Sequence, residues 1–140
     1  TNGMMVDLSG NKLKVVDHID TGRVYLDGTS KFGALDGIIR DRIKLAVNGL
    51  IIVNIIIDEN DEMLGEPWCE IRGLADFGQS DCNFIDVLEE DLSQYIRRSS
   101  ESIMQDDDKL ENDIKRIAQK TALAEIGKKP EVSIIISRLN

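Results

Sequence analysis

The chain has 140 residues, of which 41% are hydrophobic and 31% charged, and its formal net charge is -9. A chain of this size and composition can bury one hydrophobic core, so we expect one small globular domain. The acidic balance argues against a main role in holding nucleic acid, because phosphate binding is driven by Lys and Arg displacing counterions.

Neither export nor a cysteine metal site is indicated. Cys69 and Cys82 are far apart in sequence and have no neighbouring ligand residues, which favours reduced structural thiols over a disulfide or a metal site. No segment reaches the roughly 18 apolar residues of a membrane span, and no signal-peptide pattern opens the chain. We therefore expect a cytoplasmic protein that does not contact a membrane.

The first 33 residues predict a hairpin and a linker. Residues 4–8 and 13–19 form two short strands joined by Ser9-Gly10-Asn11, a turn-rich tripeptide. Between residues 21 and 33, three glycines punctuate one short strand over residues 24–26. We therefore divide the chain into a hairpin (1–20), a linker (21–33) and a domain (34–140).

Residues 35–47 favour a helix. Apolar residues recur there at spacings of three to four, and Gly49 can supply a left-handed cap after the helix. The periodic positions are Leu35, Ile39, Ile43 and Ala46 or Val47. The alternative is a strand that turns at Asn48-Gly49, a strong hairpin signal, directly into the next strand.

Three strands are predicted in the rest of the chain. Residues 50–57 are apolar at nearly every position, as expected for a central strand covered on both faces. A charged turn over residues 58–62 leads to a second strand over residues 67–74. Residues 132–139 form the third.

Two amphipathic helices are predicted before that last strand. The first takes Asp81 as its N-cap and carries an apolar stripe. The stripe comprises Ile85, Leu88, Leu92, Tyr95 or Ile96, and Ile103. The second helix begins near three aspartates, residues 106–108, and stops at residues 127–130. Its stripe comprises Leu110, Ile114, Ile117, Thr121 and Ala124.

These elements predict an α/β (α+β) two-layer sandwich, in which a roughly three-stranded mixed sheet is backed by two amphipathic helices and preceded by the hairpin and linker. Two helices cover one face of such a sheet, whereas the strands at residues 50–57 and 132–139 are apolar on both faces. We therefore predict a homodimer or higher homo-oligomer, with Ile134, Ile136 and Arg138 at the subunit interface.

No residue is predicted to be catalytic or to bind a metal. Asp58, Asn60 and Glu62 alternate like the first ligands of a calcium loop, but Met63 and Cys69 replace its required glycine and glutamate. His18 is the single histidine and has acidic neighbours, which is typical of an exposed bystander.

Two arginine pairs are more typical of ion pairs than of a phosphate site. Arg40 and Arg42 flank Asp41 on a predicted helix, so we expect local ion pairs or a contact with a neighbouring domain. Arg97 and Arg98 follow an acidic stretch of their own helix, which indicates surface pairs.

Six segments of the chain together resemble the C-terminal domain of bacterial ribonuclease J. They occur in the family's order and span most of the chain. They are Gly22-Arg23-Val24-Tyr25-Leu26-Asp27-Gly28, Ile38-Ile39-Arg40-Asp41-Arg42, the run from Gly49 to Asp58, Ile71-Arg72-Gly73, Lys120-Thr121 and Lys128-Lys129-Pro130.

The resemblance implies that catalysis belongs to a longer parent enzyme. The family's two-zinc metallo-β-lactamase domain, with its inserted β-CASP domain, lies upstream and supplies histidine-rich metal ligands. In this chain nothing of the form His-x-His-x-Asp-His occurs. Residues 1–20 then correspond to terminal strands of the parent's β-lactamase domain, and the chain, which starts at Thr1, corresponds to the enzyme's C-terminal piece.

The resulting functional expectation is an accessory one. We expect a non-catalytic assembly domain of a metal-dependent RNA hydrolase, an endonuclease and 5′-to-3′ exonuclease of RNA processing and decay, whose RNA contacts are made by the parent's catalytic domains. The alternatives are an RNA-binding module and a docking module for other decay enzymes. The RNA-binding alternative requires exposed aromatic residues interleaved with Lys and Arg, and the aromatic content is only 4%.

Overall fold

A computed structural model describes residues 1–34 and 36–139. The chain divides into two compact units, Thr1–Arg42 and Ile43–Asn140. Leu35, placed at the start of a predicted helix, lies outside the described residues. No helix in the part that the structure describes is both long and apolar enough to cross a membrane.

The first unit begins with the predicted hairpin. Strands β1 (Met4–Asp7) and β2 (Lys14–His18) pair antiparallel, and every residue in them is exposed. The Asp7 carboxylate accepts a hydrogen bond from the backbone N–H of Ser9 at 2.8 Å, which holds the turn. This bond and a second one from the Ser9 hydroxyl lower the pKa of Asp7.

A second hairpin occupies the segment that we predicted as a linker with a single strand. Strands β3 (Val24–Asp27) and β4 (Ser30–Gly33) pair antiparallel, with Asp27 opposite Ser30. The two-residue loop begins at Gly28, whose φ of 58° is the positive value that the first central position of a II′ turn requires. The prediction missed β4 because it treated Gly28 as linker punctuation.

Residues Gly37–Asn48 form helix α1, so the helical alternative is confirmed and the hairpin alternative is wrong. Gly49 has a φ of 78°, and its N–H donates to the Leu45 carbonyl at 3.0 Å. A left-handed glycine therefore ends the helix and starts the next strand, as predicted.

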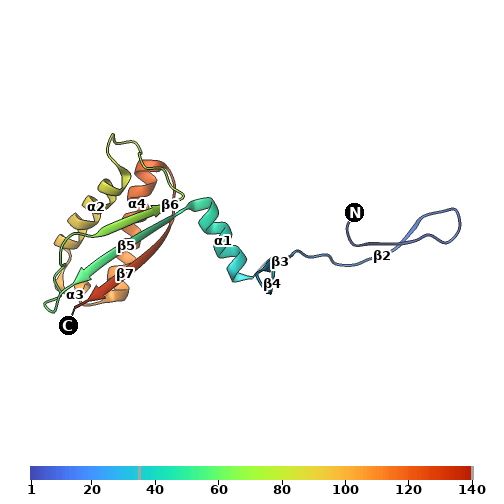
Figure 1. Ribbon diagram of the computed structural model, residues 1–140, viewed down its shortest axis with the longest axis horizontal. Helices are drawn as coiled ribbons and strands as arrows, with labels where there is room; N and C mark the ends of the chain where they lie inside the picture. The colour runs from blue at the N-terminus through green and yellow to red at the C-terminus, as the bar shows by residue number, and fades with distance from the viewer. Residues whose placement is uncertain (35, 140) are drawn as a thin grey trace. The chain divides into compact units, whose positions relative to one another are not determined.

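The second unit contains the predicted mixed sheet, in the order β6-β5-β7. The central strand is β5 (Leu50–Ile57), which pairs antiparallel with β6 (Trp68–Arg72) and parallel with β7 (Glu131–Arg138). The sheet and its helices form two layers, with the helices on one side (Figure 1). The predicted fold class is confirmed.

Three helices pack on the sheet, because the first predicted helix is divided. Helix α2 (Phe84–Arg98) ends at Ser99, and Ile103 lies in a separate short helix, α3 (Glu101–Met104). Ser99 and Ser100 are extended and interrupt the helical pattern. Asp81 is not the N-cap of α2. Asn83 is, because its side chain accepts the Ile85 N–H at 2.9 Å and sets Phe84 into the core.

Helix α4 (Asp107–Ile126) has the predicted ends. The Asp106 carboxylate caps its first turn by accepting the Lys109 N–H at 3.1 Å, and Gly127 ends it with a φ of 66°. Its buried residues are Leu110, Ile114, Ala118, Thr121 and Ala122. Of the predicted stripe, Ala124 is instead exposed and Ile117 is half-buried.

Candidate functional site

The two faces of the sheet differ in what covers them. Val53 and Ile55 of β5 point into the core with Cys69 of β6. Burial raises the pKa of the Cys69 thiol to about 12, so this side chain is a protonated core residue. Because strand side chains alternate, the residues between these positions face the other side. We call that side the open face.

The open face has an apolar row at its middle. Trp68 and Ile135 both pair with Asn54 of β5, so the three residues lie side by side across all three strands. Trp68 is 54% exposed and Ile135 is 51% exposed. Ile56 lies two positions farther along β5 and is also exposed. Large apolar groups gathered on one flat surface are typical of an interaction site.

Asn54 marks the centre of this row. Its side-chain oxygen is buried and has no hydrogen-bond partner among the described residues. A buried acceptor without a partner costs about 1–3 kcal/mol relative to a bonded one. The neighbouring side chains of the open face therefore cover a polar atom that they do not satisfy.

The outer edge of β7 is a second feature available for association. Glu131 N donates to the Gly49 carbonyl at 3.0 Å, and Leu139 N to the Ile57 carbonyl at 2.8 Å, so the odd-numbered residues bond to β5. The backbone groups of the even-numbered residues therefore point to the outer edge. No described strand pairs with this edge. Unpaired edges of this kind can accept a strand from another chain.

The three residues predicted at the interface lie on the helix-covered side of β7. Ile134 and Ile136 pack against the core, opposite Val53 and Ile55. Only their backbone groups reach the outer edge. An interface on the open face would instead use Ile135. The sequence has three consecutive isoleucines here, so it does not show which of them faces that side.

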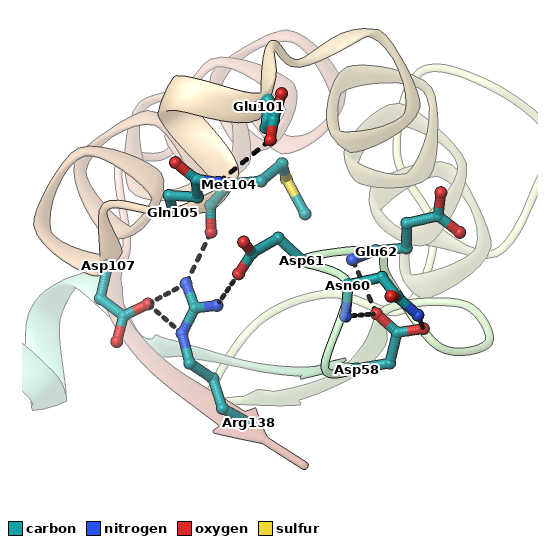
Figure 2. Close-up of polar contacts among 9 residues, drawn as sticks. All are labelled: Asp58, Asn60, Asp61, Glu62, Glu101, Met104, Gln105, Asp107 and Arg138. Atoms are coloured by element: carbon teal, nitrogen blue, oxygen red, sulfur yellow. Dashed lines mark hydrogen bonds and ion pairs between the residues drawn. The ribbon is translucent and has the colours of Figure 1, made fainter. Parts of the chain in front are cut away.

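Arg138 connects the end of β7 to three other segments (Figure 2). Its guanidinium donates to the Asp61 carboxylate at 2.7 Å, to the Asp107 carboxylate at 2.7 Å and to the Met104 carbonyl at 2.6 Å. The Asp107 contact contributes most to raising the pKa of Arg138. This arginine therefore holds the β5–β6 turn and the α3–α4 junction against the strand.

Asp58 shapes the turn that carries Asp61. Its carboxylate accepts the N–H groups of Asn60 and Glu62 at 2.9 Å each, and the Glu62 bond is the larger cause of its lowered pKa (Figure 2). This bonding matches the solvated turn expected for the segment. Within residues 1–34 and 36–139, no group of three or more His, Cys, Asp or Glu side chains is placed to hold a metal ion.

Removing the Arg138 side chain should destabilise the second unit by about 1–3 kcal/mol, because two carboxylates and a carbonyl lose their donor. The variant is Arg138→Ala, measured by urea unfolding. Arg116→Ala is the matched control, since Arg116 makes one exposed pair with Asp113 and should change stability by less than about 0.5 kcal/mol. Equal effects in the two variants would show that Arg138 is only another surface cation.

The arginines predicted at an interdomain contact lie on α1. Arg42 pairs with Asp27 of β3 at 2.7 Å, and this bond lowers the pKa of Asp27. This partner lies on a strand rather than on the helix of Arg42, so it is not the local helical pair that the alternation of Arg and Asp suggested. Arg40 is exposed on the same helix. A contact of either arginine with another domain stays a prediction.

The fold defines a class of protein, a small two-layer α/β domain with helices on one face of its sheet and exposed apolar side chains on the other. A family model described as Ribonuclease J C-terminal domain matches residues 37–139. The chain belongs to the ribonuclease J C-terminal domain family.

Two curated relatives share similarity with the chain. It is 28% identical over 142 residues to a protein named Ribonuclease J from Sinorhizobium meliloti, covering 99% of this chain and 24% of the relative. It is 32% identical over 81 residues to a protein named Ribonuclease J from Corynebacterium glutamicum, covering 56% of this chain and 11% of the relative. The chain thus spans about a quarter or less of the length of these relatives.

Proposed function

We propose that this chain is the non-catalytic assembly domain of a cytoplasmic ribonuclease J-like enzyme, and that it self-associates through the open face. The observation that carries the proposal is the pair of exposed apolar side chains, Trp68 and Ile135, which flank Asn54 across the three strands of the open face. In a two-fold contact the same apolar side chains of both copies would cover each other.

The parent's chemistry is assigned to regions other than these residues. Family membership supports a metal-dependent RNA hydrolase, with endonucleolytic and 5′-to-3′ exonucleolytic action, as the parent. Its two zinc ions would be held by the catalytic domains. The described residues do not fit such a centre, and no step of the reaction is assigned to them.

Ile135→Asp should convert a self-associated chain into a folded monomer. The carboxylate would place a like charge at the centre of both faces in a two-fold contact, and desolvating it there costs several kcal/mol. Light scattering at increasing concentration measures the mass, and far-UV circular dichroism checks the fold. Ser102→Asp is the matched control, because Ser102 is exposed on α3 and lies outside the sheet. A wild-type chain that stays monomeric at millimolar concentration would contradict the proposal.

A second variant separates the open face from the outer edge of β7. Trp68 lies on β6, at the opposite side of the sheet from that edge. Trp68→Asp should therefore dissociate the complex if the face is used and leave it intact if β7 pairs edge to edge with a second β7. Loss of association in Ile135→Asp alone would assign the interface to the edge.

A further inference from the structure

The outer side of α4 gathers positive charge in a chain whose net charge is -9. A shallow groove of about 380 Å³ runs along it. Four of its seven lining residues are Lys or Arg, and none is acidic. They are Asn112, Lys115, Arg116, Gln119, Lys120, Leu123 and Lys129. We call this set the basic face.

Acidic side chains line a different groove, and on α4 itself Glu111 lies one turn before Lys115. A groove beside α2 is lined by four carboxylates, Glu66, Asp86, Glu89 and Glu90, with Arg97 as its one cation. A further groove between α2 and α4 shares Lys120 with the basic face, and Arg98 extends the positive charge there. The net charge of the whole chain therefore does not give the sign of the charge on this side of the domain.

Three of the four cations of the basic face have no hydrogen-bond or ion-pair partner among the described residues. Lys115, Lys120 and Lys129 are exposed and make no hydrogen bond or ion pair with the described residues. Asp113 pairs with Arg116 at 3.1 Å and also accepts the hydroxyl hydrogen of Tyr95. The Asp113 carboxylate therefore already has two partners and pairs with none of the three lysines.

We propose that the basic face binds the phosphate backbone of single-stranded RNA. Charge is screened beyond about 8 Å at physiological ionic strength, so a phosphate at this face experiences mainly the nearby charges. There Lys115, Arg116, Lys120 and Lys129 outnumber Glu111 and Asp113. An acidic protein partner is less well matched, because Leu123 is the one apolar side chain among the seven and protein interfaces need buried apolar anchors. No aromatic residue lines the groove, so binding should be independent of base sequence.

The basic face is separate from the surface proposed for assembly. The sheet lies on one side of α4, and the basic face lies on the helix's solvent side. RNA binding therefore goes beyond the assembly role and does not depend on it. The dissociated Ile135→Asp chain should bind RNA with unchanged intrinsic affinity per chain, which keeps the two proposals distinguishable.

The test is fluorescence anisotropy of a labelled, unstructured RNA oligonucleotide with the whole chain over a series of salt concentrations. Single-strand binding loses about 0.7 in the slope of log affinity against log salt for each phosphate contact removed. The triple variant Lys115→Gln, Lys120→Gln, Lys129→Gln should therefore weaken binding at least about 10-fold at low salt and reduce that slope by about 2.

Two controls fix the interpretation. The first is a triple variant in the hairpins with the same change of net charge, Lys12→Gln, Lys14→Gln, Lys31→Gln, which should leave the affinity for RNA within about 2-fold of the wild-type value. The second replaces Lys115, Lys120 and Lys129 with arginine and should keep full RNA binding, because the positive charges remain. Equal losses in the two Lys→Gln triples, or no binding by the wild-type chain at low salt, would overturn the proposal. Tighter binding of a polyglutamate peptide than of RNA would assign the face to an acidic protein segment instead.

Discussion

Replacing Ile136 with aspartate should destabilise the second unit by at least about 3 kcal/mol. The side chain packs against the core beneath β7 and lies opposite Ile55. Truncating a core isoleucine costs about 2–5 kcal/mol, and the introduced carboxylate would be partly buried without a partner. Since small domains are stable by only about 5–15 kcal/mol, this loss is a large share of the unit's free energy of unfolding and should clearly lower its urea midpoint.

Urea unfolding followed by circular dichroism measures this effect, and Ile135→Asp is its control. The neighbouring side chain is on the open face, so its substitution should change the monomer's stability by about 0.5 kcal/mol or less. The two adjacent variants thus separate folding from association. If Ile136→Asp unfolded at the wild-type urea concentration, the strand's register would have to be shifted by one residue.

The side of the strand on which Ile136 lies could not be predicted from the sequence. A strand's faces are identified by alternation of apolar and polar residues, and Ile134, Ile135 and Ile136 do not alternate. The pairing of Val53 with Ile134 shows which face each isoleucine is on, because Val53 is a buried residue of the neighbouring strand β5. Long-range register of this kind is absent from local patterns.

Local sequence patterns predicted the bounds of an element correctly where a single structural signal was present. The bounds of β5 agree with the prediction, because a run of β-branched residues lies between a left-handed glycine and an acidic turn. The start of α2 was predicted wrongly: Asp81 was expected as its N-cap, but Asn83, which has equal intrinsic preference, caps the helix. Burial of Phe84 selects Asn83, and burial is a property of the folded domain.

The basic face was missed although its signal is local. We judged nucleic-acid binding from the net charge, which sums over all surfaces. On a helix, residues three and four apart share one side, and Lys115, Gln119 and Leu123 follow that spacing alongside Arg116 and Lys120. Placing charge on the predicted helix would have shown these cations together on one side, following Glu111. Predicting the open face, in contrast, would have required the register of the sheet.

Substituting Gly49 with alanine should destabilise the second unit by about 2–5 kcal/mol. Its φ of 78° is a left-handed value that costs an ordinary residue about 1–2 kcal/mol. An added Cβ would also lie 2.5 Å from Leu74 Cδ2 and 2.9 Å from the Gly73 carbonyl oxygen. Leu74 can move, but the backbone oxygen belongs to the end of the neighbouring strand, so overpacking adds a further 1–3 kcal/mol.

Gly127→Ala isolates the steric part of this effect. Gly127 is also left-handed, with a φ of 66°, but no atom lies within 4 Å of an added Cβ. Its substitution should therefore cost only the conformational term of about 1–2 kcal/mol. The difference between the two urea-unfolding free energies then measures how tightly Gly49 is held against Gly73 and Leu74. Equal values would mean that the end of β6 yields to the methyl group, so that Gly49 is required for its backbone conformation alone.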